Sequence, residues 1–143
     1  MFRRKKQYYS EIYRIVCAVA EKLAAEKLAR SLTATERKGI WNAGSLMMLE
    51  IVERDISAAQ TAESMARQLV ESSQTFERRF SESVQSLRTL LETELNRKLF
   101  DSELTFIQSL PNIWALMVIG EQVKDASSRK REAVFRELQK RTF

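Results

Sequence analysis

The scarcity of glycine and proline limits this 143-residue chain to a small number of turns. It contains three glycines and one proline, whereas a sheet needs frequent turns and builds most of them from Gly, Pro and Asn-Gly pairs. Ala, Glu, Leu, Arg, Lys and Gln together make up more than half of the chain, and these residues lose little side-chain freedom in a helix. We therefore predict an all-α fold, a bundle of five or six helices forming a single domain over 1–143.

The longest apolar pattern predicts one central helix over about 58–98. Its apolar side chains recur at intervals close to a heptad repeat. They are Met65, Leu69, Phe76, Phe80, Val84, Leu87, Leu91 and Leu95. Ser72 and Ser73 stand where one core residue is expected. A helix of this length would be a rod roughly 60 Å long, longer than a compact four-helix domain of this size, so it either kinks near Ser72-Ser73 or projects from the bundle. A projecting rod would pair with a second copy, and this alternative predicts a homodimer.

Shorter apolar patterns predict the other helices. A first helix over about 5–31 carries large apolar side chains at helical spacing. They are Tyr9, Ile12, Val16, Val19, Leu23 and Leu28. A capping box of Thr33 and Glu36 begins a second helix over about 35–56. Asp101 or Ser102 caps a further short helix, and helices also follow Pro111 and the Ser127-Ser128 pair. The helix after Pro111 is apolar nearly all round and should be central.

Two glycines, Gly39 and Gly44, lie inside the predicted second helix. Each lowers the stability of a helix by about 1 kcal/mol relative to alanine. They indicate a close helix crossing or a bend rather than a ligand site. We find no internal repeat in the sequence.

The absence of histidine removes most catalytic chemistries. Ser-His-Asp and Cys-His arrangements need a histidine base, and a Cys/His zinc site cannot be built from one cysteine. No glycine-rich phosphate-binding motif is present. We therefore predict a protein that is not an enzyme, with no metal, cofactor or small-molecule substrate. Cys17 has apolar neighbours typical of a buried thiol, and a single cysteine is compatible with the cytoplasm.

The net charge of +5 is unevenly distributed. Residues 1–30 carry a net +5 (eight basic, three acidic), residues 121–143 a net +3 (seven and four) and residues 31–120 a net −3 (nine and twelve). If the ends meet in the fold, they form a cationic surface that attracts phosphates. The residues assigned to it are Arg3, Arg4, Lys5, Lys6, Arg14, Arg129, Lys130 and Arg131. The adjacent tyrosines, Tyr8, Tyr9 and Tyr13, would stack on bases. Alternatively, the basic tails 1–6 and 139–143 are simply solvated.

The composition favours contact with a partner over catalysis. We predict an interaction or regulatory accessory protein with a protein partner, with nucleic-acid binding as the alternative and attachment to a membrane surface less favoured. No segment reaches the ~20 apolar residues of a membrane-spanning helix. Aromatic and methionine side chains are enriched at interface cores. The candidates are Trp41, Met47, Met48, Phe76 and Phe80, for which burial in the chain's own core is the alternative.

Overall fold

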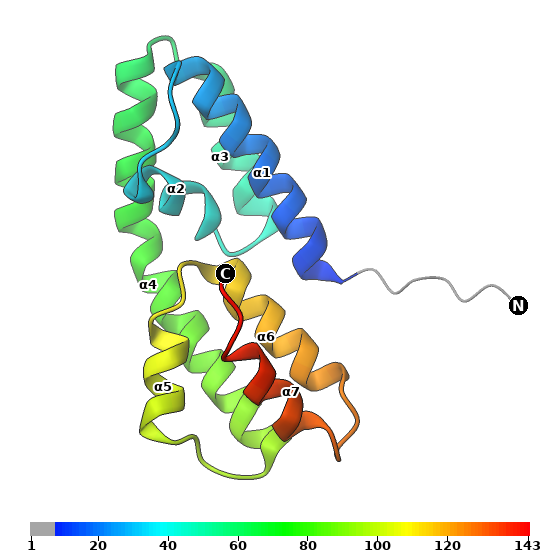
Figure 1. Cartoon of the computed structure of the whole chain (residues 1–143). Helices are drawn as coiled ribbons and strands as arrows, with labels where there is room; N and C mark the ends of the chain where they lie inside the picture. Colours follow the sequence, from blue (N-terminus) through cyan, green and yellow to red (C-terminus); the bar gives the residue numbers. More distant parts are fainter. Residues whose placement is uncertain (1–7) are drawn as a thin grey trace, which may run out of the picture.

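The chain folds into helices arranged along one long helix (Figure 1). The structure is a computed structural model that describes residues 8–143, and these form seven helices and no strands. The helices are α1 (Tyr9–Leu28), α2 (Ala34–Trp41), α3 (Leu46–Ala58), α4 (Ala62–Leu95), α5 (Asp101–Gln108), α6 (Ile113–Asp125) and α7 (Arg131–Leu138). The all-α prediction with a long central helix is confirmed, with more helices than the five or six expected.

The long helix α4 contributes to two separate apolar cores. It buries Met65, Leu69, Phe76, Val84, Leu87 and Leu91. The first three pack with α1, α2 and α3, and the last three pack with α5, α6 and α7. The helix continues without a break through Ser72 and Ser73, where the Ser73 hydroxyl donates to the Val70 carbonyl oxygen at 2.6 Å. Because other helices cover both parts of α4, its length requires neither a break nor a second copy.

The predicted second helix is in fact two helices, α2 and α3. The chain leaves the helix at Asn42 and turns at Gly44, whose φ of +88° lies in the left-handed region that favours glycine. Ser45 then caps α3 by accepting the Met48 N–H at 3.2 Å. Gly39 lies instead at a close helix crossing, the other role predicted for the two glycines. A Cβ on it would lie 2.1 Å from the Leu69 carbonyl oxygen, so α2 crosses α4 closely at this point.

Helix α1 buries a different face from the one predicted. Its buried residues are Ser10, Tyr13, Cys17, Ala20 and Ala24. The large-residue stripe is split: Val16, Leu23 and Leu28 are partly buried against the core, whereas Tyr9 and Val19 are exposed. The side chains of Cys17, Ala20 and Ala24 are small, so this face can approach its neighbours closely. The prediction of a buried Cys17 is confirmed.

Helices α1, α2 and α3 form a motif that recurs later in the chain. The short helices α2 and α5 begin at Ala34 and Asp101, 67 residues apart, and each has eight residues. Helices α3 and α6 begin at Leu46 and Ile113, again 67 residues apart, and each has 13 residues. The expectation of no internal repeat is therefore wrong.

We name residues 9–59 the first motif and residues 76–126 the second motif. Ala29 and Asn96 end the first helix of each motif with a φ of +55°, and they are the only non-glycine residues of 8–143 with a positive φ. Both motifs also bury many of the same positions. The buried pairs include Cys17 and Val84, Ala20 and Leu87, Ala24 and Leu91, Ile40 and Ile107, Leu49 and Leu116, and Ile56 and Val123.

A bidentate ion pair closes the same turn in both motifs. Arg30 donates to the two carboxylate oxygens of Glu36 at 2.8 and 2.9 Å, and Arg97 donates to those of Glu103 at 2.9 Å each. Each glutamate also accepts the backbone N–H three residues earlier at 2.8 Å. In the first motif this donor is Thr33, so the predicted capping box is confirmed. Such two-point charged contacts fix the direction in which the chain enters α2 and α5.

The two motifs solve one hydrogen-bonding problem in different ways. The Tyr13 hydroxyl accepts the Gly44 N–H at 3.0 Å and donates to the Trp41 carbonyl oxygen at 2.6 Å, within the turn between α2 and α3. At the corresponding positions the second motif has Phe80 and Pro111. Phenylalanine has no hydroxyl and proline has no N–H, so the second motif lacks both the acceptor and the donor of the Tyr13–Gly44 hydrogen bond. Neither a hydroxyl nor an N–H is therefore left there without its partner.

Helix α6 is central, as predicted. It buries seven of its 13 residues and contacts α1, α4 and α7. It also joins the motifs, because the buried Asn42 side chain accepts the Ile113 N–H at 2.9 Å and the Trp41 and Trp114 rings meet edge to face at 5.9 Å. Its N-cap is Asn112, whose side chain accepts the Ala115 N–H at 3.0 Å, so Pro111 lies just before the helix rather than in its first turn.

Candidate interaction surface

Exposed apolar side chains gather on α1 and α3. Residues 8–143 expose six large hydrophobic side chains, and five of them lie on these two helices. The five are Tyr9 (44% exposed), Ile15 (50%), Val19 (53%), Met47 (73%) and Ile51 (40%). The sixth, Phe100, is covered on one side by the Arg97 guanidinium, 4.5 Å from its ring centre. We call the five residues the α1–α3 surface.

The two helices of this surface run side by side in the same direction. The Tyr9 hydroxyl accepts the Leu46 N–H at 3.2 Å at one end of the pair. At the other end the Lys27 ammonium donates to the carbonyl oxygens of Ile56 and Ser57 at 2.8 and 2.9 Å. Helix α1 lies at the periphery of the molecule, with α3 beside it (Figure 1). The surface is therefore carried by two packed helices rather than by a loop.

The five residues predicted to contact a partner are placed differently from one another. Trp41 and Phe76 are buried in the core of the first motif. Phe80 and Met48 are half-buried, each against an apolar core of this chain. Met47 is exposed and is the one candidate on the α1–α3 surface. Sequence reasoning missed Tyr9, Ile15, Val19 and Ile51. Helical periodicity assigned Tyr9 and Val19 to the buried stripe of the first helix, and it assigned neither Ile15 nor Ile51 to a surface.

The beginning of α1 lies against the end of α6. The Tyr8 hydroxyl donates to the Asp125 carboxylate, and the hydroxyl and N–H of Ser10 donate to the two oxygens of the Glu121 carboxylate. Because Asp125 directly precedes the 126–130 connection, the first residues of α1 lie near that connection. The predicted basic residues Arg3, Arg4, Lys5 and Lys6, with the tail 1–6, are outside the described residues.

The remaining predicted basic residues are not all available to a phosphate. Arg14, Arg129 and Lys130 are exposed. Arg131, in contrast, pairs with the Glu94 carboxylate at 3.0 Å and donates to the Ala126 carbonyl oxygen at 3.1 Å. Its guanidinium therefore already connects α7 to α4.

The tyrosines expected to stack on bases have contacts within the chain. Tyr13 is fully buried, and the hydroxyls of Tyr8 and Tyr9 bond to Asp125 and Leu46. At the other terminus, the tail 139–143 is not wholly solvated, since the Phe143 ring meets the Trp114 ring at 6.0 Å. The C-terminal residue thus lies at the opposite end of α6 from Asp125.

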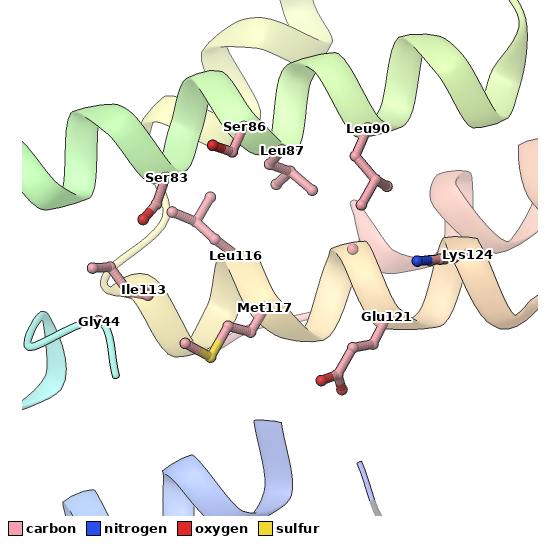
Figure 2. A pocket seen from close by; sticks show the side chains of 11 residues that line it. Gly44, Ser83, Ser86, Leu87, Leu90, Ile113, Leu116, Met117, Glu121 and Lys124 are labelled. Carbon is pink, nitrogen blue, oxygen red and sulfur yellow. The ribbon is translucent and has the colours of Figure 1, made fainter. Parts of the chain in front are cut away.

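A shallow groove of about 380 Å³ lies between α4 and α6 (Figure 2). Its lining residues are Gly44, Ser83, Ser86, Leu87, Leu90, Ile113, Leu116, Met117, Gly120, Glu121 and Lys124. Figure 2 shows Leu87 and Leu90 pointing from α4 toward α6, with Ile113 toward one end of the groove and Glu121 and Lys124 toward the other. Both oxygens of the Glu121 carboxylate accept hydrogen bonds from Ser10. This carboxylate therefore holds α1 against α6.

The perturbed ionisable groups have structural explanations. The Arg30 guanidinium lowers the pKa of Glu36 to about 2, and Arg97 lowers the pKa values of Glu103 and Glu132. Burial raises the pKa of the Cys17 thiol to about 12, which disfavours the thiolate that a nucleophile or metal ligand needs. These groups stabilise turns and the core, and none of them opens onto the groove.

No helix within 8–143 is long and apolar enough to cross a membrane. In the same residues, no three His, Cys, Asp or Glu side chains are grouped so that they could hold a metal ion. Comparison of the chain with protein-family models, curated proteins and solved structures gave no match.

Proposed function

We propose that this protein is a non-enzymatic interaction module that binds a protein partner through the α1–α3 surface. The observation that carries the proposal is the concentration of exposed apolar side chains on two adjacent helices. Single exposed hydrophobic residues are normal on a protein surface, whereas a cluster of them is typical of a binding site. The single buried Cys17 supports a reducing compartment such as the cytoplasm.

The second motif supplies an internal comparison for this surface. Tyr9 corresponds to Phe76, which is 3% exposed, and Ile51 corresponds to Val118, which is 7% exposed. Met47 corresponds to Trp114, which contacts the rings of Trp41 and Phe143. The same motif positions are therefore covered in one copy and uncovered in the other. A partner that covers Tyr9, Met47 and Ile51 would bury in the first motif the positions that the second motif covers with residues of its own chain.

Site-specific photo-crosslinking tests the proposal. A benzophenone side chain at Met47 should give a discrete adduct with a second polypeptide in cells that express the protein. The same group at Phe100, which is exposed but lies outside the α1–α3 surface, serves as the matched control. We expect an adduct from position 47 and none from position 100. An adduct only from position 100, or from neither position, would contradict the proposal.

Nucleic-acid binding provides a separate arm of the test. A counterion-release interaction should shift labelled RNA or DNA at low salt and disappear steeply as salt is added. The proposal expects no such shift, because Arg131 and the tyrosines already have contacts within the chain. A salt-sensitive shift together with no adduct at Met47 would favour the basic ends instead.

A further inference from the structure

We propose that the exposed face of α1 binds a second copy of this chain, with the two α1 helices antiparallel. This inference rests on the proposed function and names the occupant of one part of the α1–α3 surface. The face contains Ile15 and Val19, each about half exposed. The exposed Ala18 lies between them, and its small side chain lets another helix approach closely.

The fold itself does not require apolar residues on this face. Ile15 and Val19 correspond to Glu82 and Ser86 in the second motif, and both of these polar residues are exposed. The second motif therefore folds with polar residues at these two positions, while it buries Val84, Leu87 and Leu91 where α1 buries Cys17, Ala20 and Ala24. The apolar character of α1 at these positions is a feature of the first motif alone, which indicates contact with another molecule rather than a role in folding.

Two charged residues on α1 select the second copy and its direction. Glu11 and Lys22 are exposed on the same side of α1 as Ile15, one near each end of the apolar pair. They are 11 residues apart, which is about 16 Å along a helix. No other residue of 8–143 forms an ion pair with either side chain.

An antiparallel pair whose two-fold axis passes between Val16 and Cys17 brings each Glu11 opposite the partner copy's Lys22. In the same register Ile15 of one copy lies opposite Ala18 of the other, and Val19 packs beside them. A parallel pair would instead place Glu11 opposite Glu11 and Lys22 opposite Lys22, and like charges at such positions oppose pairing. The charges therefore favour one partner, a second copy, in one orientation.

Charge reversal tests this arrangement directly. Either Glu11→Lys or Lys22→Glu places like charges at both contacts of a homodimer, and each should weaken self-association roughly tenfold at low salt. An equimolar mixture of the two variants restores both opposite-charge contacts in the mixed dimer. We expect sedimentation velocity to show monomer for each variant alone and dimer for the mixture. The exposed Arg78, which corresponds to Glu11 in the second motif, gives the control Arg78→Glu, and this variant should associate as the wild type does.

Three results would overturn the inference: a wild-type chain that stays monomeric up to about 0.5 mM, variants that dimerise as the wild type does, or a mixture no more associated than its parts. The concentration limit allows for a small and therefore weak interface. Circular dichroism of each variant confirms that the exposed substitutions leave the fold intact. An adduct at Met47 to a different protein, with a monomeric chain, would leave the proposed function standing while removing this inference.

Discussion

Replacing Gly39 with alanine tests the close crossing of α2 and α4. The added Cβ would lie 2.1 Å from the Leu69 carbonyl oxygen and 2.9 Å from its carbonyl carbon. A carbon and a carbonyl oxygen rarely approach closer than about 3.3 Å, so the helices must separate by about 1.2 Å. The atoms in conflict belong to the α4 backbone, which cannot rotate away as a flexible side chain could.

The expected cost follows from two opposing effects. Alanine favours a helix over glycine by about 1 kcal/mol. Overpacking a core, with the backbone shifts that it forces, costs about 1–3 kcal/mol and occasionally more, and the crossing lies beside the buried Ile40 and Leu69. With the overpacking cost at the upper end of that range and the helix gain subtracted, we expect Gly39→Ala to lower the free energy of unfolding by about 2 kcal/mol. For a chain of this size the melting temperature should fall by roughly 6–10 °C.

Gly120→Ala is the matched control in the same assay. Gly120 is also buried in a helix, but a Cβ there would lie 3.5 Å from the nearest atom, a methyl carbon of Leu87, which is an ordinary contact distance. This variant should keep or raise the melting temperature by a few degrees, because the helix preference of alanine acts unopposed. Thermal and urea unfolding followed by circular dichroism measure both variants.

The outcome that refutes the reasoning is a Gly39→Ala protein as stable as the wild type. It would mean that α2 and α4 separate at little cost, and that the crossing is not set by the absence of a side chain. A Gly39→Ala chain that does not fold is the extreme of the expected result, provided that Gly120→Ala folds normally.

Three further predictions concern single side chains. Glu36 has a pKa of about 2 in the folded chain against an ordinary value of 4.5; its ion pair therefore stabilises the fold above pH 4.5, and about 2 kcal/mol should be lost as the pH falls toward 2. Urea unfolding of Glu36→Gln should show a smaller loss over that range, and an unchanged loss would argue against this pair. Tyr13→Phe leaves the Gly44 N–H and Trp41 carbonyl without their partner and should cost about 1–3 kcal/mol of unfolding free energy; an unaffected midpoint in urea would show that water replaces the hydroxyl. Cys17, fully buried with a pKa of about 12, should react with iodoacetamide at pH 8 at least about a hundredfold more slowly than in urea, and equal rates would place it in contact with solvent.

The sequence predicted the helices more accurately than it predicted their faces. The heptad-like spacing from Met65 to Leu95 identified α4, since a buried stripe has the same period in any helical environment. In α1 two sets of residues compete at helical spacing, and the fully buried set consists of Tyr13 and the small residues Cys17, Ala20 and Ala24. Hydrophobicity alone cannot choose between them, because the choice depends on how closely the neighbouring helices approach.

The internal repeat was missed because it is conserved in backbone conformation more than in residue type. The left-handed position is Ala29 in one motif and Asn96 in the other, and neither is a glycine that would mark it. The N-caps of α3 and α6 are Ser45 and Asn112, different residues that make the same hydrogen bond. The sequence also did not separate the turn at Gly44 from the helix crossing at Gly39. The φ of +88° identifies Gly44 as the turn.

Of the candidate surface, the sequence identified only Met47. Tyr9 and Val19 follow the same helical periodicity as core residues, so their exposure depends on which elements reach that side of α1. The pairing of Arg131 with Glu94 was equally out of reach, because it joins residues 37 positions apart through the folding of α5 and α6 between them.

The continuity of α4 fixes the length of the link between the two motifs. Its first part completes the core of the first motif, and its last 20 residues, 76–95, are the first helix of the second. Adding one residue near Ser72 would turn everything after it by about 100° and advance it by about 1.5 Å. The Trp41 and Trp114 rings and the contact of Ser10 with Glu121 could not survive such a rotation. The number of residues in α4 therefore determines how the two motifs pack against each other.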